Sequence, residues 1–471
     1  MLKSNIAWMK KNVPSDLKVW KGMIQDIDWS QVAAKAKLSL QRDKDRITAE
    51  FKEFAAMDTS AKIDWLMNGD RHLGYLYKKD AIAFARREWK GLKSVGYDFV
   101  GWLKIWGGML NMVMKDPMSI MLAVFEYHWF ASYLATPAVV DRSVFGRRGK
   151  LLQADFDMWV AITHWAEDLI ANLIMADAKI GGNQKINKRI IMFDEMTMAQ
   201  MMAGFPNLLG IPYQMIPVFM VSEMDQLTLI PYIDAIESYG LPSDTCPLPT
   251  AECGCAVKDE YPMCGQGFIA SSMPCDGSVM ATSFQDRRFS KFMPSYPLCM
   301  PVRYDDEDTT EMAAADMKDC IHWVEGLTGE TWNWDTYFAT MEKMNECTRL
   351  EMEKWEINKT HYPQLVGSSF ELFRKWNYEM DGGLFPEGLK TQRKICKTMM
   401  ETYEKKLPAY VGGYEKYRAL IWSCPAHFYA NFSNWLANCW GIYALTEMEA
   451  LNMTKMLNTT DKDEAINDLC R

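Results

Sequence analysis

The chain has 471 residues, of which 49% are hydrophobic and 24% charged, and it carries a formal net charge of −9. This length exceeds what one hydrophobic core usually supports, so two or three domains are expected. The composition is that of a folded globular protein rather than a disordered or fibrous one. The acidic balance argues against nucleic acid as a partner.

No secretion signal is predicted, because the basic stretch Met1 to Lys11 runs into Asn12, Val13 and Pro14 rather than into a long apolar segment. The longest apolar run, Ser119 to Val140, has membrane-spanning length but contains a glutamate and a histidine. We therefore expect a buried amphipathic helix there, no stable membrane insertion, and a cytoplasmic protein.

Residues 1–183 are predicted to form a large, mainly helical N-terminal region. Apolar residues recur at three- and four-residue spacing in Ala81 to Lys93, Val100 to Val113 and Asp155 to Ala176. The sequence Gly181-Gly182-Asn183 then predicts a break in the chain.

Residues 184–330 are predicted to form a first α/β domain, because short apolar runs of strand length alternate there with helical patterns. The predicted strands are Arg189 to Phe193, Phe268 to Met273 and Leu298 to Tyr304. The predicted helices are Thr197 to Ala203, Ser278 to Phe292 and Thr310 to Leu327.

Residues 331–415 are predicted to be a helical connector that begins with a long helix over Trp332 to Thr360. Residues 416–471 are predicted to form a second, short α/β domain with strands Ala419 to Trp422 and Ile442 to Leu445 and a helix over Asn431 to Cys439. The expected fold class is thus α/β, with two flavodoxin- or Rossmann-like parallel-sheet domains.

Six of the twelve cysteines lie between Cys246 and Cys299, a density that random placement in a core would not give. A reducing cytosol keeps thiols free, so these cysteines do not indicate a disulfide framework. Thiolates in such a compartment bind zinc or iron–sulfur clusters, which makes this stretch the candidate metal site.

Cys275 has the most informative setting. It follows a predicted buried strand, and Asp276 and Ser278 offer the side chains that begin a helix. Ligands bind at the carboxyl edge of open α/β sheets, and a helix N-terminus there lowers a thiol pKa and favours an anionic cluster.

Cys246 precedes Pro247 and Pro249 in a stretch without core periodicity, which predicts a solvent-side or ligand-bearing loop. Cys253 and Cys255 flank a glycine in the same stretch. They could hold zinc together with Cys246 and Cys264, although no paired C-x-x-C spacing supports a zinc ribbon.

Other catalytic motifs are missing from the sequence. It contains no G-x-x-x-x-G-K-[ST] phosphate loop, no G-x-G-x-x-G and no H-E-x-x-H, so the chain is not expected to hydrolyse ATP itself. His164 and His427 lie among aromatic residues, where a core or interface histidine is commoner than a catalytic one.

The sequence resembles the 2-hydroxyacyl-CoA dehydratase and benzoyl-CoA reductase family over about Lys185 to Met448. The stretches that carry the resemblance are Lys188 to Asp194 with Met201 to Gly204, the cysteine-bearing stretch after Cys246, Pro274-Cys275-Asp276 with Tyr296 to Tyr304, and Arg418 to Pro425. The similarity is strongest around Cys275.

The resemblance implies an iron–sulfur subunit with two related α/β domains, in which three cysteines hold a [4Fe-4S] cluster. Cys246 and Cys275 would be two of these ligands, with Cys255 as an alternative to Cys246. It further implies a second cluster-bearing subunit, a separate ATP-dependent activator protein and an acyl-CoA substrate. The reaction would be dehydration of a 2-hydroxyacyl-CoA or reduction of an aromatic acyl-CoA such as benzoyl-CoA. The resemblance neither requires nor excludes a flavin as a further cofactor.

The third ligand has no clear match. In the family it comes late in the second α/β domain, which is short here, so Cys470 is a weak candidate beside Cys424 and Cys439. Two alternative functions follow: a non-catalytic assembly subunit of such a complex, and a zinc-binding structural protein that uses the cysteines near Gly254.

Overall fold

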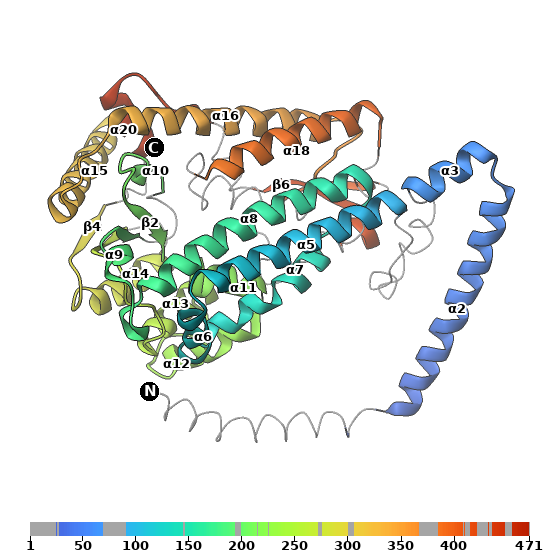
Figure 1. Ribbon diagram of the computed structural model, residues 1–471, viewed down its shortest axis with the longest axis horizontal. Coiled ribbons are helices and arrows are strands. Elements are labelled where there is room, and N and C mark those ends of the chain that lie inside the picture. The colour runs from blue at the N-terminus through green and yellow to red at the C-terminus, as the bar shows by residue number, and fades with distance from the viewer. Residues whose placement is uncertain are drawn as a thin grey trace.

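The computed structural model consists mostly of helices, with a small parallel sheet near the middle of the chain (Figure 1). It describes residues 25, 28–68, 91–144, 147–193, 199–213, 215–224, 226–271, 276–299, 306–366, 385–407, 409, 415–421, 432, 436–447 and 455–470. The combination of helices and a parallel sheet confirms the predicted α/β class.

A series of helices precedes the sheet in the chain. They are α2 (Trp29–Ala56), α3 (Thr59–Asn68), α5 (Leu92–Lys115), α6 (Pro117–Glu126), the 3₁₀ segment η2 (Trp129–Ala135), α7 (Thr136–Ser143) and α8 (Gly149–Ala176). Helix α2 projects from the body as an arm, whereas α5 and α8 lie side by side (Figure 1). The predicted helices Val100 to Val113 and Asp155 to Ala176 are confirmed within α5 and α8. Ala81 to Lys93 lies mostly outside the described residues.

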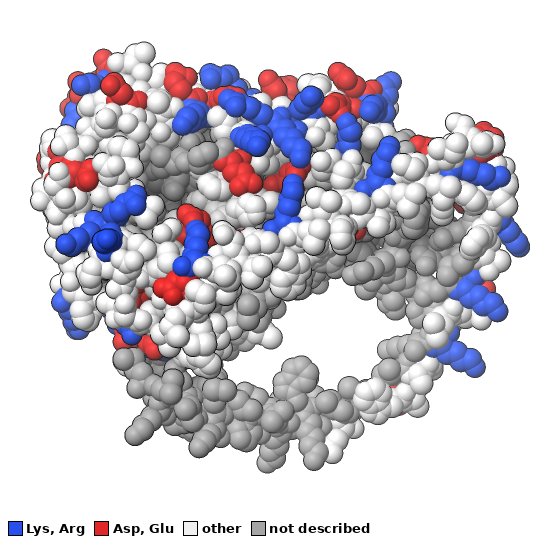
Figure 2. All heavy atoms as spheres, in the orientation of Figure 1, with Lys and Arg blue, Asp and Glu red and all other residues white. Residues whose placement is uncertain are grey.

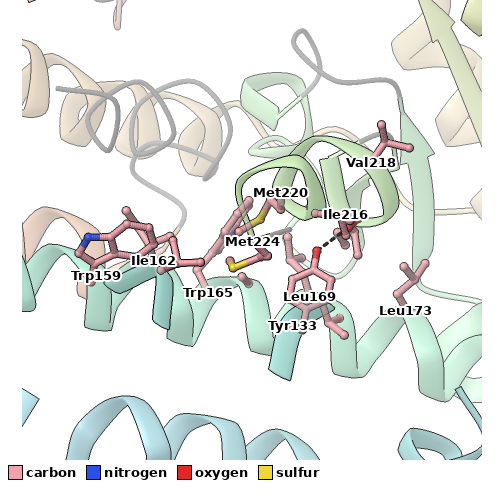
Figure 3. Packing of buried hydrophobic residues seen from close by; sticks show 14 of the residues in the cluster. Tyr133, Trp159, Ile162, Trp165, Leu169, Leu173, Ile216, Val218, Met220 and Met224 are labelled. Atoms are coloured by element: carbon pink, nitrogen blue, oxygen red, sulfur yellow. Dashed lines mark hydrogen bonds between the residues drawn. The ribbon is translucent and has the colours of Figure 1, made fainter. Parts of the chain in front are cut away.

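Helix α8 is the central element of the larger hydrophobic core. Apolar side chains at three- and four-residue spacing, from Trp159 to Leu173, point toward the π-helical turn η4 (Met215–Phe219) and helix α11 (Met220–Met224) (Figure 3). Tyr133 of η2 reaches the same cluster and donates its hydroxyl proton to the carbonyl of Ile216.

A ladder of polar pairs joins α8 to α18 (Pro386–Glu404), which runs antiparallel along it. The pairs follow at seven-residue steps on both helices: Lys150 with Glu401, Asp157 with Lys394, and His164 with Glu387. Figure 2 shows residues of both charge signs interspersed over this face. The expectation that His164 is an interface histidine is thus confirmed, and His427 lies outside the described residues.

The sheet has four parallel strands in the order β2-β1-β3-β4. They are β1 (Ile190–Phe193), β2 (Leu209–Pro212), β3 (Gly267–Ser271) and β4 (Ser295–Leu298). Between them lie the 3₁₀ segment η5 (Gln226–Leu229) and the helices α10 (Ala199–Met202), α12 (Ile230–Glu237), α13 (Pro247–Val257) and α14 (Asp276–Phe289), while η3 (Ala178–Ile180) and α9 (Gln184–Asn187) precede β1. The chain leaves β1 toward β2 and returns to β3 on its other side. The carboxyl ends of β1 and β3 therefore form the topological switch point where open α/β sheets bind ligands.

The sheet is buried on both faces, because successive side chains of its strands enter two different cores. Ile190 and Met192 of β1 pack into the core built on α8, whereas Ile191 and Phe193 pack into a second core. That second core also includes side chains of α15 (Glu307–Thr328), α16 (Trp334–Asn358) and α20 (Lys462–Cys470). The N-terminal helices and the sheet thus share one hydrophobic core.

The C-terminal part contains β5 (Tyr417–Ile421), the π-helical turn η7 (Leu436–Trp440) and β6 (Ile442–Glu447). Strands β5 and β6 pair in parallel, which confirms the two strands predicted there. The predicted helix Asn431 to Cys439 is only partly described. Helices α15 and α16 confirm the predicted helices Thr310 to Leu327 and Trp332 to Thr360.

The predicted elements differ from the structure in several details. Ser119 to Val140 is not one helix, because Tyr127 has extended backbone angles and ends α6. Strand β4 ends at Leu298, where the next backbone N–H bonds to the Asp316 carboxylate at 2.6 Å, and most of the strand predicted from Leu298 to Tyr304 lies outside the described residues. Strand β2 was not predicted, since its glycine and proline are unfavourable in strands.

In the part of the chain that the structure describes, no helix has both the length and the apolarity needed to cross a bilayer.

The close packing of α13 on α12 gives a test of the fold. A Cβ added at Gly254 would lie 1.9 Å from the backbone oxygen of Tyr232, so Gly254→Ala must push the two helices apart. We expect a loss of about 2 kcal/mol in the free energy of unfolding, measured by chemical denaturation. The matched control is Gly326→Ala in α15, where nothing lies within 4 Å and a gain of about 0.5 kcal/mol is expected. Equal effects of the two substitutions would contradict the packing of α13.

Candidate metal centre

Helices α13 and α14 pack side by side. Cys253 and Ala281 share a small core cluster in the middle of the two helices. Just beyond the end of α13, Asp259 forms an ion pair with Arg288, near the end of α14. Ala281 lies 28 positions after Cys253, and Arg288 lies 29 positions after Asp259, so the two helices run in the same direction with nearly the same offset along both.

This register brings the N-termini of the two helices together. It sets Pro247, the first residue of α13 after Cys246, near the level of Asp276, the first residue of α14. Because α14 follows β3 in the chain, both N-termini lie at the carboxyl edge of the sheet. Two helix dipoles therefore present their positive ends at one place, which favours thiolates and other anions.

Cys246 is exposed and occupies the N-cap position of α13. Its backbone carbonyl accepts hydrogen bonds from the N–H of Thr250 at 3.2 Å and the Thr250 hydroxyl at 2.8 Å, which closes the first turn. Pro247 at the first helical position suits the start of a helix, because its missing N–H would have had no partner there. The thiol of Cys246 is thus presented to solvent at a helix N-terminus.

Cys275 lies outside the described residues, but the elements on either side of it are described. Strand β3 ends at Ser271 and α14 begins at Asp276, which confirms the predicted change from strand to helix around this cysteine.

Cys253, Cys255 and Cys264 do not lie in an open loop, as the sequence had suggested. The first two are buried on α13, on opposite sides of Gly254, and Cys264 is buried before β3. Cys253 packs into the small cluster with Ala281, whereas Cys255 and Cys264 pack into the core of α8. Burial raises the pKa of the Cys253 thiol to about 12, and it also raises the pKa of the Cys255 thiol well above its ordinary value. These thiols are not brought together for zinc.

Cys470, the weak third-ligand candidate, is buried on α20 among apolar side chains of the second core. Burial raises the pKa of its thiol to about 12. Cys424 and the side chain of Cys439 lie outside the described residues. Within the described residues, no three His, Cys, Asp or Glu side chains are grouped so that they could hold a metal ion.

Cys299 is a candidate that the sequence did not single out. It is exposed and directly follows β4, whose last residue Leu298 pairs with Ser271 at the end of β3. The Asp316 carboxylate fixes its backbone and also accepts a hydrogen bond from the Tyr296 hydroxyl at 2.7 Å. The strand predicted from Leu298 to Tyr304 hid this position, because it placed Cys299 inside the strand.

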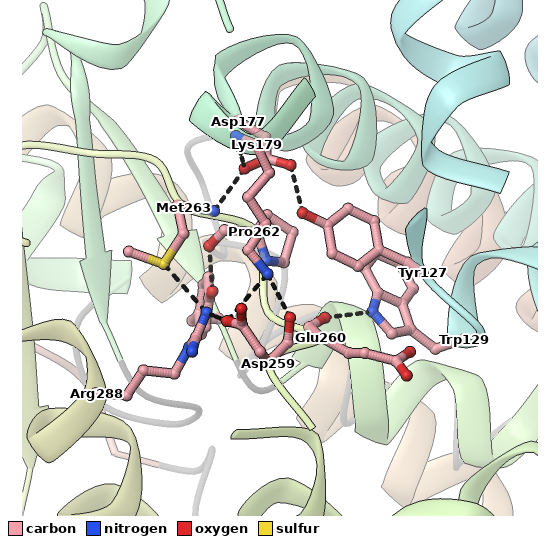
Figure 4. Close-up of polar contacts among 10 residues, drawn as sticks. Tyr127, Trp129, Asp177, Lys179, Asp259, Glu260, Pro262, Met263 and Arg288 are labelled. Carbon is pink, nitrogen blue, oxygen red and sulfur yellow. Dashed lines mark hydrogen bonds and ion pairs between the residues drawn. The ribbon is translucent and has the colours of Figure 1, made fainter. Parts of the chain in front are cut away.

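A buried carboxylate fixes the segment between α13 and β3. Asp177, at the end of α8, accepts hydrogen bonds from the backbone N–H of Met263 at 2.7 Å and of Lys179 at 3.1 Å, and from the Tyr127 hydroxyl (Figure 4). Burial raises the pKa of Asp177, although these hydrogen bonds oppose that shift. The core of the N-terminal helices is thereby tied to the entry of β3.

The turn after α13 is held by charge as well. Asp259 forms ion pairs with Lys179, at 3.1 Å, and with Arg288 at the end of α14 (Figure 4). The neighbouring Glu260 accepts the indole N–H of Trp129 at its carbonyl, at 2.9 Å. These contacts fix the C-terminal ends of α13 and α14 and thus the register that aligns their N-termini.

The exposure of the cysteines predicts their reactivity. In the native, metal-free protein, iodoacetamide should modify Cys246 and Cys299 first, because they are the exposed thiols among the described cysteines. The buried Cys253, Cys255 and Cys470 should react only after denaturation, and peptide mass spectrometry measures each site separately. Modification of Cys255 at the rate of Cys246 in the folded protein would contradict the burial of α13.

Comparison with known proteins identifies the family. The 2-hydroxyglutaryl-CoA dehydratase D-component family matches residues 226–471, slightly more than half of the chain. The match begins later than the expected resemblance, which started at Lys185, and it continues beyond Met448 to the last residue. It includes α13, β3, α14 and β4. No match was found among curated proteins. The chain belongs to the 2-hydroxyglutaryl-CoA dehydratase D-component family.

Proposed function

We propose that this chain is the cluster-bearing subunit of a 2-hydroxyacyl-CoA dehydratase-type enzyme, in which Cys246 and Cys275 hold a [4Fe-4S] cluster. The observation that supports this most is the parallel register of α13 and α14. It sets the start of α13, which Cys246 precedes, near the start of α14 at Asp276, at the carboxyl edge of the sheet.

The surroundings suit an anionic cluster. Two helix N-termini supply positive partial charge, and the exposed Cys246 can reach a cluster without opening the core, whereas Cys255 is buried. Cys246 is therefore the better first ligand of the two. The α/β domain of residues 184–330 would carry this site, with the connector at 331–415 and the second domain at 416–471.

A third thiolate is needed, and Cys299 is the described cysteine whose position suits it best. It is exposed at the end of β4, beside the strand that leads to Cys275. Cys470 suits it less well, because releasing its thiol would open the apolar contacts of α20 with α15.

When bound, the cluster would supply one-electron chemistry to the thioester of an acyl-CoA. The chain's own part is to position that substrate and to keep water from it. The absence of a phosphate loop from the sequence fits a separate ATP-hydrolysing activator. Dehydration of a 2-hydroxyacyl-CoA is favoured over ring reduction of benzoyl-CoA because the matching family is a dehydratase component. The proposal does not require a flavin, and it places the protein in the cytoplasm.

The cluster proposal predicts a brown protein. Anaerobic purification should yield about four iron and four sulfide per chain, by iron and acid-labile sulfide analysis. Cys246→Ser and Cys275→Ser should each lose most of both. The matched control Cys396→Ser removes a buried thiol on α18 and should keep them.

A colourless protein that takes up neither iron nor sulfide on anaerobic reconstitution would contradict the proposal. Zinc without sulfide would instead favour the zinc-binding alternative. Unchanged cluster content in both variants would move the site away from α13 and α14.

The alternative is a non-catalytic assembly subunit of such a complex. It is motivated by the third cluster ligand, for which the sequence shows no clear match. Under this alternative, Cys275→Ala leaves the activity of the assembled complex unchanged. Under the main proposal the same substitution abolishes both cluster and turnover.

Membership of a component family implies a heteromeric complex, and we propose that the partner is a second cluster-bearing subunit of the same family. The outer face of α5 supports such an assembly. It leaves a row of exposed apolar side chains at three- and four-residue spacing: Leu92, Val95, Phe99, Leu103, Trp106, Leu110 and Val113. Monomeric proteins seldom expose so long an apolar row.

Charges placed in this row should weaken assembly. The double substitution Trp106→Glu and Leu110→Glu is expected to raise the dissociation constant of the complex with its coexpressed partner subunit at least tenfold, by light scattering across a dilution series. The control places the same charges at Met352 and Met400, which are exposed on α16 and α18. An equal effect of both double substitutions, or none from the first, would contradict a role for α5.

A further inference from the structure

Helix α5 has apolar faces on two opposite sides. Its inner face packs on α8, and Gly101 lets the helices approach closely, since an added Cβ would lie 2.4 Å from Phe156 (Figure 1). Its outer face carries the exposed row from Leu92 to Val113. A helix that is apolar on all sides normally lies inside a core, and only four of the 24 residues of α5 are charged. The outer face therefore calls for a neighbour.

The outer row follows a heptad repeat. Two series with seven-residue spacing alternate at steps of four and three residues: Leu92, Phe99, Trp106 and Val113, and Gly96, Leu103 and Leu110. This is the spacing of the a and d positions of a coiled coil, in which one helix packs along another at a crossing angle of about 20°. The exposed face of α5 thus fits a single helix of similar length.

Gly96 is the member of this repeat that lacks a side chain. Nothing in the described part of the chain lies within 4 Å of a Cβ placed there, so the packing of this chain does not explain the glycine. Glycine also weakens the interior of a helix relative to alanine. A large side chain that enters from another chain would account for the space at Gly96.

A second copy of α5 supplies such a side chain when the two helices run antiparallel. The a positions of one helix then face the d positions of the other. In the register centred on Gly101, Gly96 lies opposite Trp106 of the second copy, so the position without a side chain meets the largest one in the row. The other facing pairs are apolar as well: Leu92 with Leu110, and Phe99 with Leu103. Each pair occurs twice about the two-fold axis, which makes six layers.

The charges of α5 do not oppose this pairing. Lys104 and Lys115 lie neither in the heptad row nor directly beside it, whereas Lys93 flanks the row near one end. In the antiparallel pair the two copies of Lys93 lie at opposite ends, about 24 Å apart at 1.5 Å per residue, which is more than twice the Debye length at physiological ionic strength.

We propose that α5 joins two copies of this chain as an antiparallel two-stranded coiled coil, in which Gly96 of each copy receives Trp106 of the other. The inference rests on the assembly role proposed for α5 and names the chain on the other side of it. A complex with the partner subunit would then contain this chain twice. A fluid lipid surface would require no such match between a glycine and an indole.

Multi-angle light scattering of the full chain, expressed without a partner subunit, tests the proposal. The native chain should have twice the mass of one copy at micromolar concentration. Leu103→Glu places a charge near the centre of the row and should raise the dissociation constant of the dimer at least tenfold. The matched control is Lys104→Glu, at the next residue but outside the row, and it should leave the constant unchanged.

A compensation experiment tests the register. Gly96→Trp should weaken the dimer by setting two indoles against each other, and Trp106→Ala should weaken it by leaving the space at Gly96 empty. The double variant restores one large and one small side chain in each pair, so its dissociation constant should return close to the native value. Circular dichroism checks that each variant keeps the native helix content.

A chain that stays monomeric at high micromolar concentration would overturn the proposal, as would a dimer that Leu103→Glu leaves intact or a double variant no tighter than either single one. A monomer that floats with phosphatidylglycerol vesicles would assign the face to lipid instead. A complex with one copy of each subunit, joined through α5, would keep the assembly proposal and overturn this one. The cluster proposal is read from iron and sulfide content and stands or falls separately.

Discussion

The parallel packing of α13 on α14 is the constraint on which the candidate metal centre depends. It is fixed at the C-terminal ends by the ion pair between Asp259 and Arg288, and the buried Asp177 ties the following segment to the end of α8. Because α14 follows β3 in the chain, the same packing places both helix N-termini at the carboxyl edge of the sheet. The nearness of the start of α13, which Cys246 precedes, to the start of α14 follows from these contacts.

The strand β3 and the helix α14, which flank Cys275 in the chain, could be predicted from the sequence, because a short apolar run followed by capping side chains is a local signal. The helical form of α13 could not be predicted from the sequence. Its prolines and its two cysteines around Gly254 suggested a loop, yet Pro247 begins the helix and nearly all of its later residues are buried. A helix that is buried all round has no amphipathic period, so its cysteines looked like loop ligands.

A tertiary contact also determines the position of Cys299, which the sequence did not single out. Cys299 lies outside β4 because the Asp316 carboxylate binds its backbone N–H, and no local sequence pattern indicates that contact. The N-terminal helices share the core of the sheet, so they are part of the scaffold of the candidate metal centre.

The most direct measurement of the central claim is anomalous diffraction at the iron edge from anaerobically grown crystals of the full chain. We expect one strong iron peak beside the N-termini of α13 and α14, with the sulfur atoms of Cys246 and Cys275 about 2.3 Å from its nearest irons, as for cysteine thiolates on a metal. An iron peak elsewhere in the molecule, with Cys246 facing solvent and bound to nothing, would contradict it.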